Sequence, residues 1–126
     1  MGEKVIFNRQ GAAKAFLLDG TFYDYEGQPI AFLYDDNFVV SYTGKHLGWF
    51  YNGYIRDFKG DAVGYAIGAR LGPVTPADAG KPPRMPSKLG TPPARVEPKE
   101  TEETGVLSYA WSADTLEHFF SNGRGR

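Results

Sequence analysis

Residues 45–60 read KHLGWFYNGYIRDFKG, and this stretch is one full period of a repeat that governs the fold. Similar stretches recur about every 16 residues, and aligning them places Gly11, Gly27, Gly44 and Gly60 at the same position of the repeat. A unit of this length suits one β-hairpin, which packs against its neighbours in the repeat. The units are Val5–Gly20, Thr21–Asp36, Phe38–Gly53 and Tyr54–Ala69, with Asn37 inserted after the second.

Each unit contains a predicted turn at its centre, because a turn-forming side chain stands three positions before the repeat glycine. Asn, Asp or Ser at the first position of a type I turn bonds the backbone, and glycine closes the turn. The unit boundaries Asp19-Gly20 and Asn52-Gly53 are typical of two-residue hairpin turns, which need positive φ. The turn-forming residues are Asn8, Asp24, Ser41 and Asp57.

The segments between these turns are rich in Phe, Tyr, Val and Ile, which favours strands and excludes helix. The sequence therefore predicts an all-β fold of four tandem β-hairpin repeats, with eight short antiparallel strands around a pseudo-fourfold axis. Because a single hairpin is marginal in water, the four hairpins must pack on one another, either around this axis or alternatively along a solenoid.

Three positions of the repeat hold similar side chains in every unit. The first strand carries a large apolar residue, and the second carries a small residue followed by an aromatic one. The apolar and small positions are expected to line the central seam, where small residues allow close approach. Alternatively, the small residues only relieve crowding beside the aromatics. These positions are Ile6, Phe22, Val39 and Ile55; Ala15, Ala31, Gly48 and Gly64; and Phe16, Phe32, Trp49 and Tyr65.

A change in composition divides the chain. Eight of the nine prolines lie between Pro73 and Pro98, in a stretch without aromatic residues. Such a stretch favours extended polyproline II conformation and is predicted to be a semi-rigid, solvated spacer, or alternatively a proline-rich recognition strip. We therefore expect a repeat domain at residues 3–70, a linker at residues 71–104 and a docking tail at residues 105–126.

The tail is predicted to hold a strand at Val106–Trp111 and a short helix. Residues 112–115 can cap a helix that runs through Phe120 and stops at Asn122-Gly123. A helix this short is unstable alone, so it is expected to dock on its own repeat domain or on that of a second copy. Its apolar face consists of Leu116, Phe119 and Phe120.

Charge and composition exclude several classes of protein. The formal net charge of −1 offers no overall field for nucleic acid or an anionic membrane, and no partner of either kind is expected. The chain has no cysteine and two histidines, so we expect no disulfide, no metal site and no cofactor. No apolar run is long enough to span a membrane and no signal segment is present, so a cytoplasmic location is expected.

Self-association is expected because a repeat domain of about 65 residues rarely gains enough stability from its own core. Several strands are apolar on both faces, so one face needs covering by the tail or by a second subunit. A homo-oligomer, most simply a dimer, follows on symmetry grounds. The candidate interface residues are Phe50, Trp111, Leu116, Phe119 and Phe120.

Three kinds of chemistry could use the polar and aromatic side chains of the repeat. Ser41, His46 and Asp57 have the composition of a hydrolytic triad, but the turns between them give no reason to expect its geometry. The turn-forming oxygens could line a rim that binds a cation, although turn formation already explains them. Exposed aromatics could form a cage for a cationic ligand. The candidate binding residues are Trp49, Tyr51, Tyr54, Tyr65 and His46; no catalytic residue is assigned.

The segments Ile6–Gly11 and Lys45–Asp57, together with Gly60, resemble the bacterial four-fold beta flower family over roughly residues 3–70. The resemblance implies four hairpins arranged as petals about an axis, and it implies no known activity, catalytic residue or cofactor. The sequence thus favours a non-enzymatic interaction or self-association module, with a protein or small molecule as a further partner. The alternative is a small-molecule-binding protein with an aromatic cage or an axial pocket, or a small hydrolase.

Overall fold

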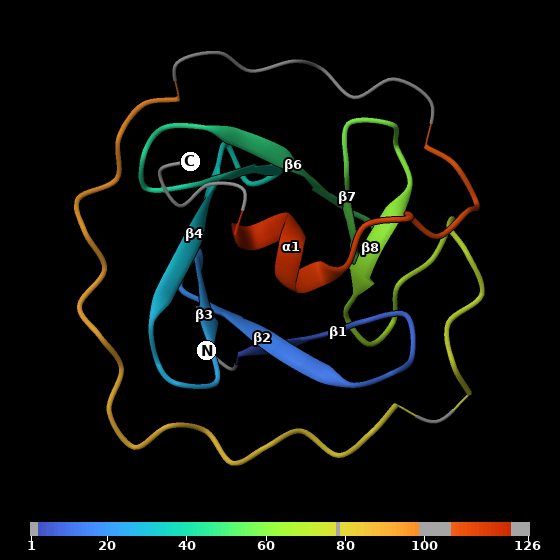
Figure 1. Ribbon diagram of the computed structural model, residues 1–126, viewed down its shortest axis with the longest axis horizontal. Helices are drawn as coiled ribbons and strands as arrows, with labels where there is room; N and C mark the ends of the chain where they lie inside the picture. The colour runs from blue at the N-terminus through green and yellow to red at the C-terminus, as the bar shows by residue number, and fades with distance from the viewer. Residues whose placement is uncertain (1–2, 78, 99–106, 122–126) are drawn as a thin grey trace.

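Eight strands form a closed antiparallel barrel in which each strand pairs with its neighbours in sequence, as the repeat predicts (Figure 1). The computed structural model describes residues 3–77, 79–98 and 107–121. None of these residues belongs to a helix long and apolar enough to cross a membrane. The elements are β1 (Lys4–Phe7), β2 (Ala13–Leu18), β3 (Thr21–Asp24), β4 (Pro29–Tyr34), β5 (Phe38–Val40), β6 (His46–Tyr51), β7 (Tyr54–Arg56), β8 (Ala62–Tyr65) and α1 (Leu116–Ser121).

The central turn of each hairpin, or petal, is built in the same way. In the second petal, Asp24 Oδ1 accepts hydrogen bonds from the N–H groups of Glu26 and Gln28, at 2.9 and 3.0 Å. The Gly27 N–H donates to the Asp24 carbonyl at 3.0 Å. The predicted role of the turn residues is therefore confirmed. Equivalent bonds are made by Asn8, Ser41 and Asp57.

The hairpin turns at the unit boundaries also follow the sequence. Both residues have positive φ at Asp19-Gly20 and at Asn52-Gly53, as type I′ turns require. The fourth unit differs, because at its boundary only Gly68 has positive φ. The petals are thus equivalent at their centres and less regular at their boundaries.

The apolar repeat position lines the barrel axis, and its four members, Ile6, Phe22, Val39 and Ile55, are fully buried in one core cluster. The small repeat position faces the same interior. A Cβ atom on Gly48 would lie 2.1 Å from the Arg56 carbonyl oxygen and 2.8 Å from Phe119 Cε1. Small residues here therefore allow both close strand approach and the entry of side chains from α1.

Helix α1 lies over the axis at the centre of the ring of petals (Figure 1). Thr115 caps it, since its Oγ1 accepts a hydrogen bond from the His118 N–H at 3.1 Å. Its apolar face, Leu116, Phe119 and Phe120, is buried in the barrel core, and the Phe120 ring lies 5.4 Å from that of Phe22. The tail thus docks on its own barrel, and the predicted helix stop at residues 122–123 lies outside the described residues.

The strand predicted at Val106–Trp111 does not form over the part of it that the structure describes. Residues 107–110 are irregular, and Trp111 makes only an isolated parallel bridge with Ala62. Val106 lies outside the described residues. The tail pairs with β8 at Ala62 only, whose N–H donates to the Ala110 carbonyl at 3.1 Å and whose carbonyl accepts from the Ser112 N–H at 2.7 Å, and one bridge is too short to make a strand.

The proline-rich segment runs along the outside of the barrel, on the right, lower and left sides of the view in Figure 1. Residues 70–77 and 79–98 are called the belt here. The Gly80 N–H donates to the Gly11 carbonyl at 2.7 Å, and Arg95 Nη2 donates to the Asp19 carbonyl at 2.9 Å. Neither sequence interpretation of this segment included contacts with the barrel.

The ring closes between β8 and β1 through a single register pair, Phe7 with Tyr65. Every other pair of neighbouring strands in this barrel shares three or four register pairs. The Trp111 ring lies 6.1 Å from that of Tyr65 beside this closure. The tail therefore supports the place where the barrel has the least strand pairing.

We predict that Phe119→Ala lowers the free energy of unfolding by about 3–5 kcal/mol, because it leaves a cavity under Gly48 that the rigid barrel cannot refill. Glu117→Ala, on the exposed side of α1, is the matched control. It removes only the surface ion pair with Lys14, 3.2 Å apart, and should cost less than about 1 kcal/mol. Urea unfolding measures both, and equal losses would contradict the docking of α1.

Candidate functional site

One position of the repeat breaks the chemical pattern of the other petals. The residue before the turn residue is Phe7, Tyr23 or Val40 in the first three petals, and Arg56 in the fourth. Arg56 lies at the end of β7 opposite Trp49, and its side chain is fully buried. A charged side chain in the interior needs partners for its donors, so the contacts of Arg56 indicate what this quarter of the barrel does.

The Arg56 guanidinium bonds main-chain groups from three parts of the chain. Nη1 donates to the carbonyls of Gly60, at 2.7 Å, and Ser108, at 2.8 Å. Nη2 donates to the Leu71 carbonyl at 3.0 Å. Leu71 lies at the start of the belt and Ser108 in the tail, so Arg56 holds both to the fourth petal. We call Tyr54, Arg56, Leu71, Pro73 and Ser108 the clasp.

Tyr54 completes the clasp. The Arg56 guanidinium carbon lies 5.2 Å from the centre of the Tyr54 ring, and the Tyr54 hydroxyl donates to the Pro73 carbonyl. Burial lowers the pKa of Arg56 and raises the pKa of Tyr54. Both groups are thus held away from water by the first residues of the belt.

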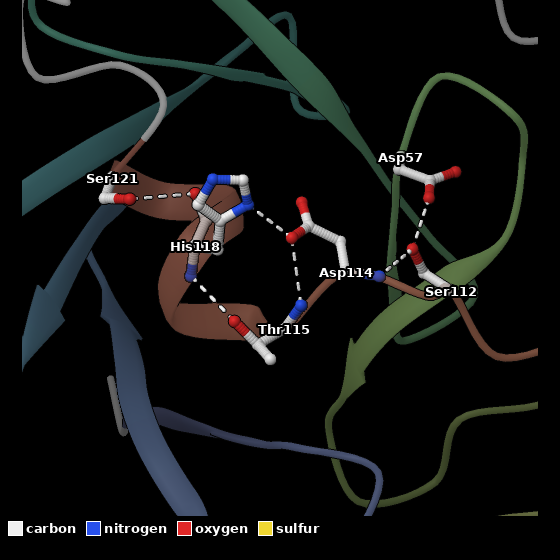
Figure 2. Close-up of polar contacts among 6 residues, drawn as sticks. All are labelled: Asp57, Ser112, Asp114, Thr115, His118 and Ser121. Carbon is white, nitrogen blue, oxygen red and sulfur yellow. Dashed lines mark hydrogen bonds and ion pairs between the residues drawn. The ribbon is translucent and has the colours of Figure 1, made fainter.

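A second set of polar contacts ties the chain before α1 to the fourth petal (Figure 2). The Ser112 hydroxyl donates to Asp57 Oδ2 at 2.5 Å and accepts from the Asp114 N–H at 3.0 Å. The Ser108 hydroxyl donates to Asp61 Oδ1 at 2.5 Å. The two carboxylates at the fourth turn therefore fix the path of the tail toward the barrel axis.

The exposed face of α1 carries a histidine and a carboxylate. His118 Nδ1 lies 2.5 Å from Asp114 Oδ1, as Figure 2 shows. The Ser121 hydroxyl is directed at the His118 main-chain oxygen, at 3.0 Å, and not at the imidazole ring. This geometry stabilises the helix and does not form a nucleophile–base pair.

The sequence-predicted binding residues lie in two separate clusters. His46 and Trp49 pack on each other with ring centroids 5.0 Å apart, while Tyr54 and Tyr65 lie beside Trp111 at the clasp. All four predicted residues are buried. The fifth, Tyr51, accepts a hydrogen bond from Asn37 Nδ2 at 2.6 Å. The structure does not bring the five together into one cage.

The sequence-predicted interface residues lie under or beside the tail. Leu116, Phe119 and Phe120 are buried in the core, and Phe50 packs against the same cluster. Trp111 is half-buried against Tyr54 and Tyr65. The tail itself therefore covers much of the apolar surface that sequence reasoning left open.

Turn formation occupies the side chains considered for hydrolysis and cation binding. The Ser41 hydroxyl bonds Thr43 Oγ1 and accepts from the Lys45 N–H, and Asp57 accepts from backbone groups of its own turn and from Ser112. Within residues 3–77, 79–98 and 107–121, no group of three or more His, Cys, Asp or Glu side chains could hold a metal.

Sequence reasoning missed Arg56, Leu71 and Ser108. The signal for Arg56 was present, because it is the charged member of a repeat position that is otherwise apolar or aromatic. Leu71 and Ser108 bind through their main-chain carbonyls. Every residue has such a group, so the residue type does not indicate this role.

Comparison with known proteins gave one match. A family described as "4-fold beta flower protein" matches residues 4–120, which include the belt and most of α1 as well as the barrel. The resemblance derived from sequence covered only the barrel. No curated protein and no solved structure matches the chain.

We predict that Arg56→Met lowers the free energy of unfolding by about 2–4 kcal/mol, because three carbonyls lose their donors. Arg95→Met removes the other arginine that ties belt to barrel, but at an exposed site, and should cost less than about 1 kcal/mol. Urea unfolding compares the two, and amide hydrogen exchange should show faster exchange in the belt of Arg56→Met. Equal stability of both variants would contradict the clasp.

We also predict a loss of stability at alkaline pH. Burial raises the pKa of Tyr54 and Tyr65 above the ordinary value of 10.0. The contribution of these two neutral hydroxyls to the free energy of unfolding is therefore complete below about pH 10. It is lost as pH rises through their pKa values in the folded state.

Tyr65→Phe should weaken that loss without lowering stability at pH 8, because the buried Tyr65 hydroxyl has no hydrogen-bond partner among the described residues. Tyr54→Phe should lower stability at pH 8, since it removes the bond to Pro73. Urea unfolding at pH 8 and pH 10.5 tests both. An unchanged alkaline loss in Tyr65→Phe would contradict this assignment.

Proposed function

The chain belongs to the 4-fold beta flower protein family, and we propose that it acts as a non-enzymatic self-association module. The family description names a shape and no chemistry. The proposal therefore rests on the surface that the barrel, belt and tail leave exposed.

The observation that carries the proposal is a group of exposed apolar side chains at the clasp. Leu71 is 53% exposed, Val74 is 90% exposed and Tyr109 is 68% exposed. Arg56 bonds the carbonyls of both Leu71 and Ser108, so the main chain beside Leu71 and the main chain beside Tyr109 lie close together at the clasp. Apolar side chains gathered in one place are typical of an association surface. We call Leu71, Val74 and Tyr109 the clasp patch.

A second copy of the chain is the partner that we propose. The same patch on two molecules can meet across a two-fold axis. Both copies of each patch residue are then buried in one symmetric interface. The formal net charge of −1 opposes such contact only weakly. The rigid hold of Arg56 on the main chain supports this role, because a surface that is already ordered loses less entropy on binding.

Small-molecule binding has less support. A ligand at the axial opening would compete with α1, whose phenylalanines occupy that position. An aromatic cage would need accessible rings, and Trp49, Tyr54 and Tyr65 are each only 2% exposed. A hydrolase has no support from Ser41 or Asp57, because both side chains serve turns.

Light scattering at micromolar concentration tests the proposal. We expect a dimer for the unchanged chain and a monomer for Leu71→Asp/Tyr109→Asp, which adds charge to the patch and leaves the carbonyls bound by Arg56 in place. Val96→Asp is the matched control and should remain a dimer, since Val96 is 40% exposed but lies in the belt next to Arg95, which bonds Asp19 at the end of the first petal. A monomer for the unchanged chain would refute self-association.

A further inference from the structure

Two glycines of the belt bind the barrel in the same way. The Gly80 N–H donates to the Gly11 carbonyl at 2.7 Å, and the Gly90 N–H donates to the Gly27 carbonyl at 2.7 Å. Gly11 and Gly27 occupy the same position in successive petals. The belt therefore makes one contact twice, each time on the glycine that closes the central turn.

The belt sequence repeats together with this contact. Gly80-Lys81-Pro82-Pro83 and Gly90-Thr91-Pro92-Pro93 share the pattern Gly-X-Pro-Pro and start ten residues apart. These ten residues lead from the docking point on the first petal to the equivalent point on the second, so petal and belt segment are matched units.

Absence of side chains makes the close approach possible. A Cβ atom on Gly27 would lie 2.7 Å from the Lys88 carbonyl oxygen and 3.4 Å from Pro86 Cβ. A Cβ atom on Gly80 would lie 3.1 Å from the Gly11 carbonyl oxygen. The glycines on both sides thus let an extended backbone lie directly on the turn.

A hollow adjoins the first docking point. It has a volume of about 540 Å³, within the range of about 300–1,000 Å³ common for ligand pockets. Its apolar wall comes from β1 and from the end of the fourth unit, and Gly80 and Pro82 of the belt form another side. The wall residues are Val5, Phe7, Ala66 and Ile67.

We propose that the outer wall of the petals is a binding site for extended peptides of the Gly-X-Pro-Pro type, and that the chain's own belt occupies this site in the free protein. The turn carbonyl recognises the glycine N–H, and the proline that follows lines the hollow beside it, as Pro82 of the belt does. Proline-rich peptides suit such a site because they are extended before binding and lose little entropy. This site is separate from the clasp patch and does not depend on dimer formation.

Occupation by the belt determines how a peptide from another molecule binds. Such a peptide binds only when the belt leaves the turn, so its apparent affinity is reduced by the fraction of molecules with a free site. Weakening the belt without altering the petals should therefore strengthen binding of the external peptide.

The test uses a fluorescent peptide with the sequence of residues 79–98 and the full-length chain. The variant Gly80→Pro/Gly90→Pro removes both belt donors and leaves the petals unchanged. Fluorescence anisotropy should show binding to the variant at least tenfold tighter than to the unchanged chain. A peptide with the same two Gly→Pro changes is the control and should bind neither protein. Failure of both proteins to bind the unmodified peptide, or equal binding of the control peptide, would overturn the proposal.

Amide hydrogen exchange of the unchanged chain tests the site even if the variant does not fold. Gly80 and Gly90 should exchange slowly, and millimolar peptide should accelerate both while leaving the core strands protected. Absence of protection, or no effect of the peptide, would contradict the proposed site. Leu71→Asp/Tyr109→Asp should bind the peptide like the unchanged chain, which separates this result from that for the dimer.

Discussion

The closure of β8 on β1 is the constraint on which the rest of the structure depends. A ring of hairpins gains full strand pairing only when its ends meet, and here they meet through Phe7 and Tyr65 alone. The remaining support at this closure comes from outside the repeat. Trp111 packs beside Tyr65, and Leu116 of α1 lies against Gly64. The tail is therefore an integral part of the folded domain. The family match, which extends to residue 120, agrees with this.

Burial of Arg56 gives the clasp a defined geometry. Its removal from water is costly, and its three hydrogen bonds to main-chain carbonyls offset that cost; the equivalent residue of the third petal is Val40, which needs no polar partner. The guanidinium is planar and carries donors in fixed directions, so it can hold carbonyls from the turn, the belt and the returning chain at once. The clasp thus specifies one path for a segment that has little secondary structure of its own.

The four hairpins and the helix could be predicted because the information for them is local and repeated. Asp24 and Asp57 bond their own turns and Thr115 caps the helix, each within a few residues, and Ile6 and Ile55 recur at the same position of the repeat. The path of the belt was not predictable in this way, since Gly80 meets Gly11 across about 70 positions through main-chain atoms. The repeat likewise identifies an aromatic position in each petal but not which segment covers it, so the packing of Trp111 on Tyr54 and Tyr65 could not be predicted.

The late position of α1 in the chain has a consequence for biosynthesis. Translation delivers all four petals before Leu116 and Phe119, the residues that fill the axis. Arg95 and Asp19, which are 76 positions apart, meet only after most of the chain has left the ribosome. The nascent protein must therefore pass through a stage in which its axial phenylalanine and isoleucine side chains face solvent, and it is at this stage that aggregation and chaperone binding compete with folding.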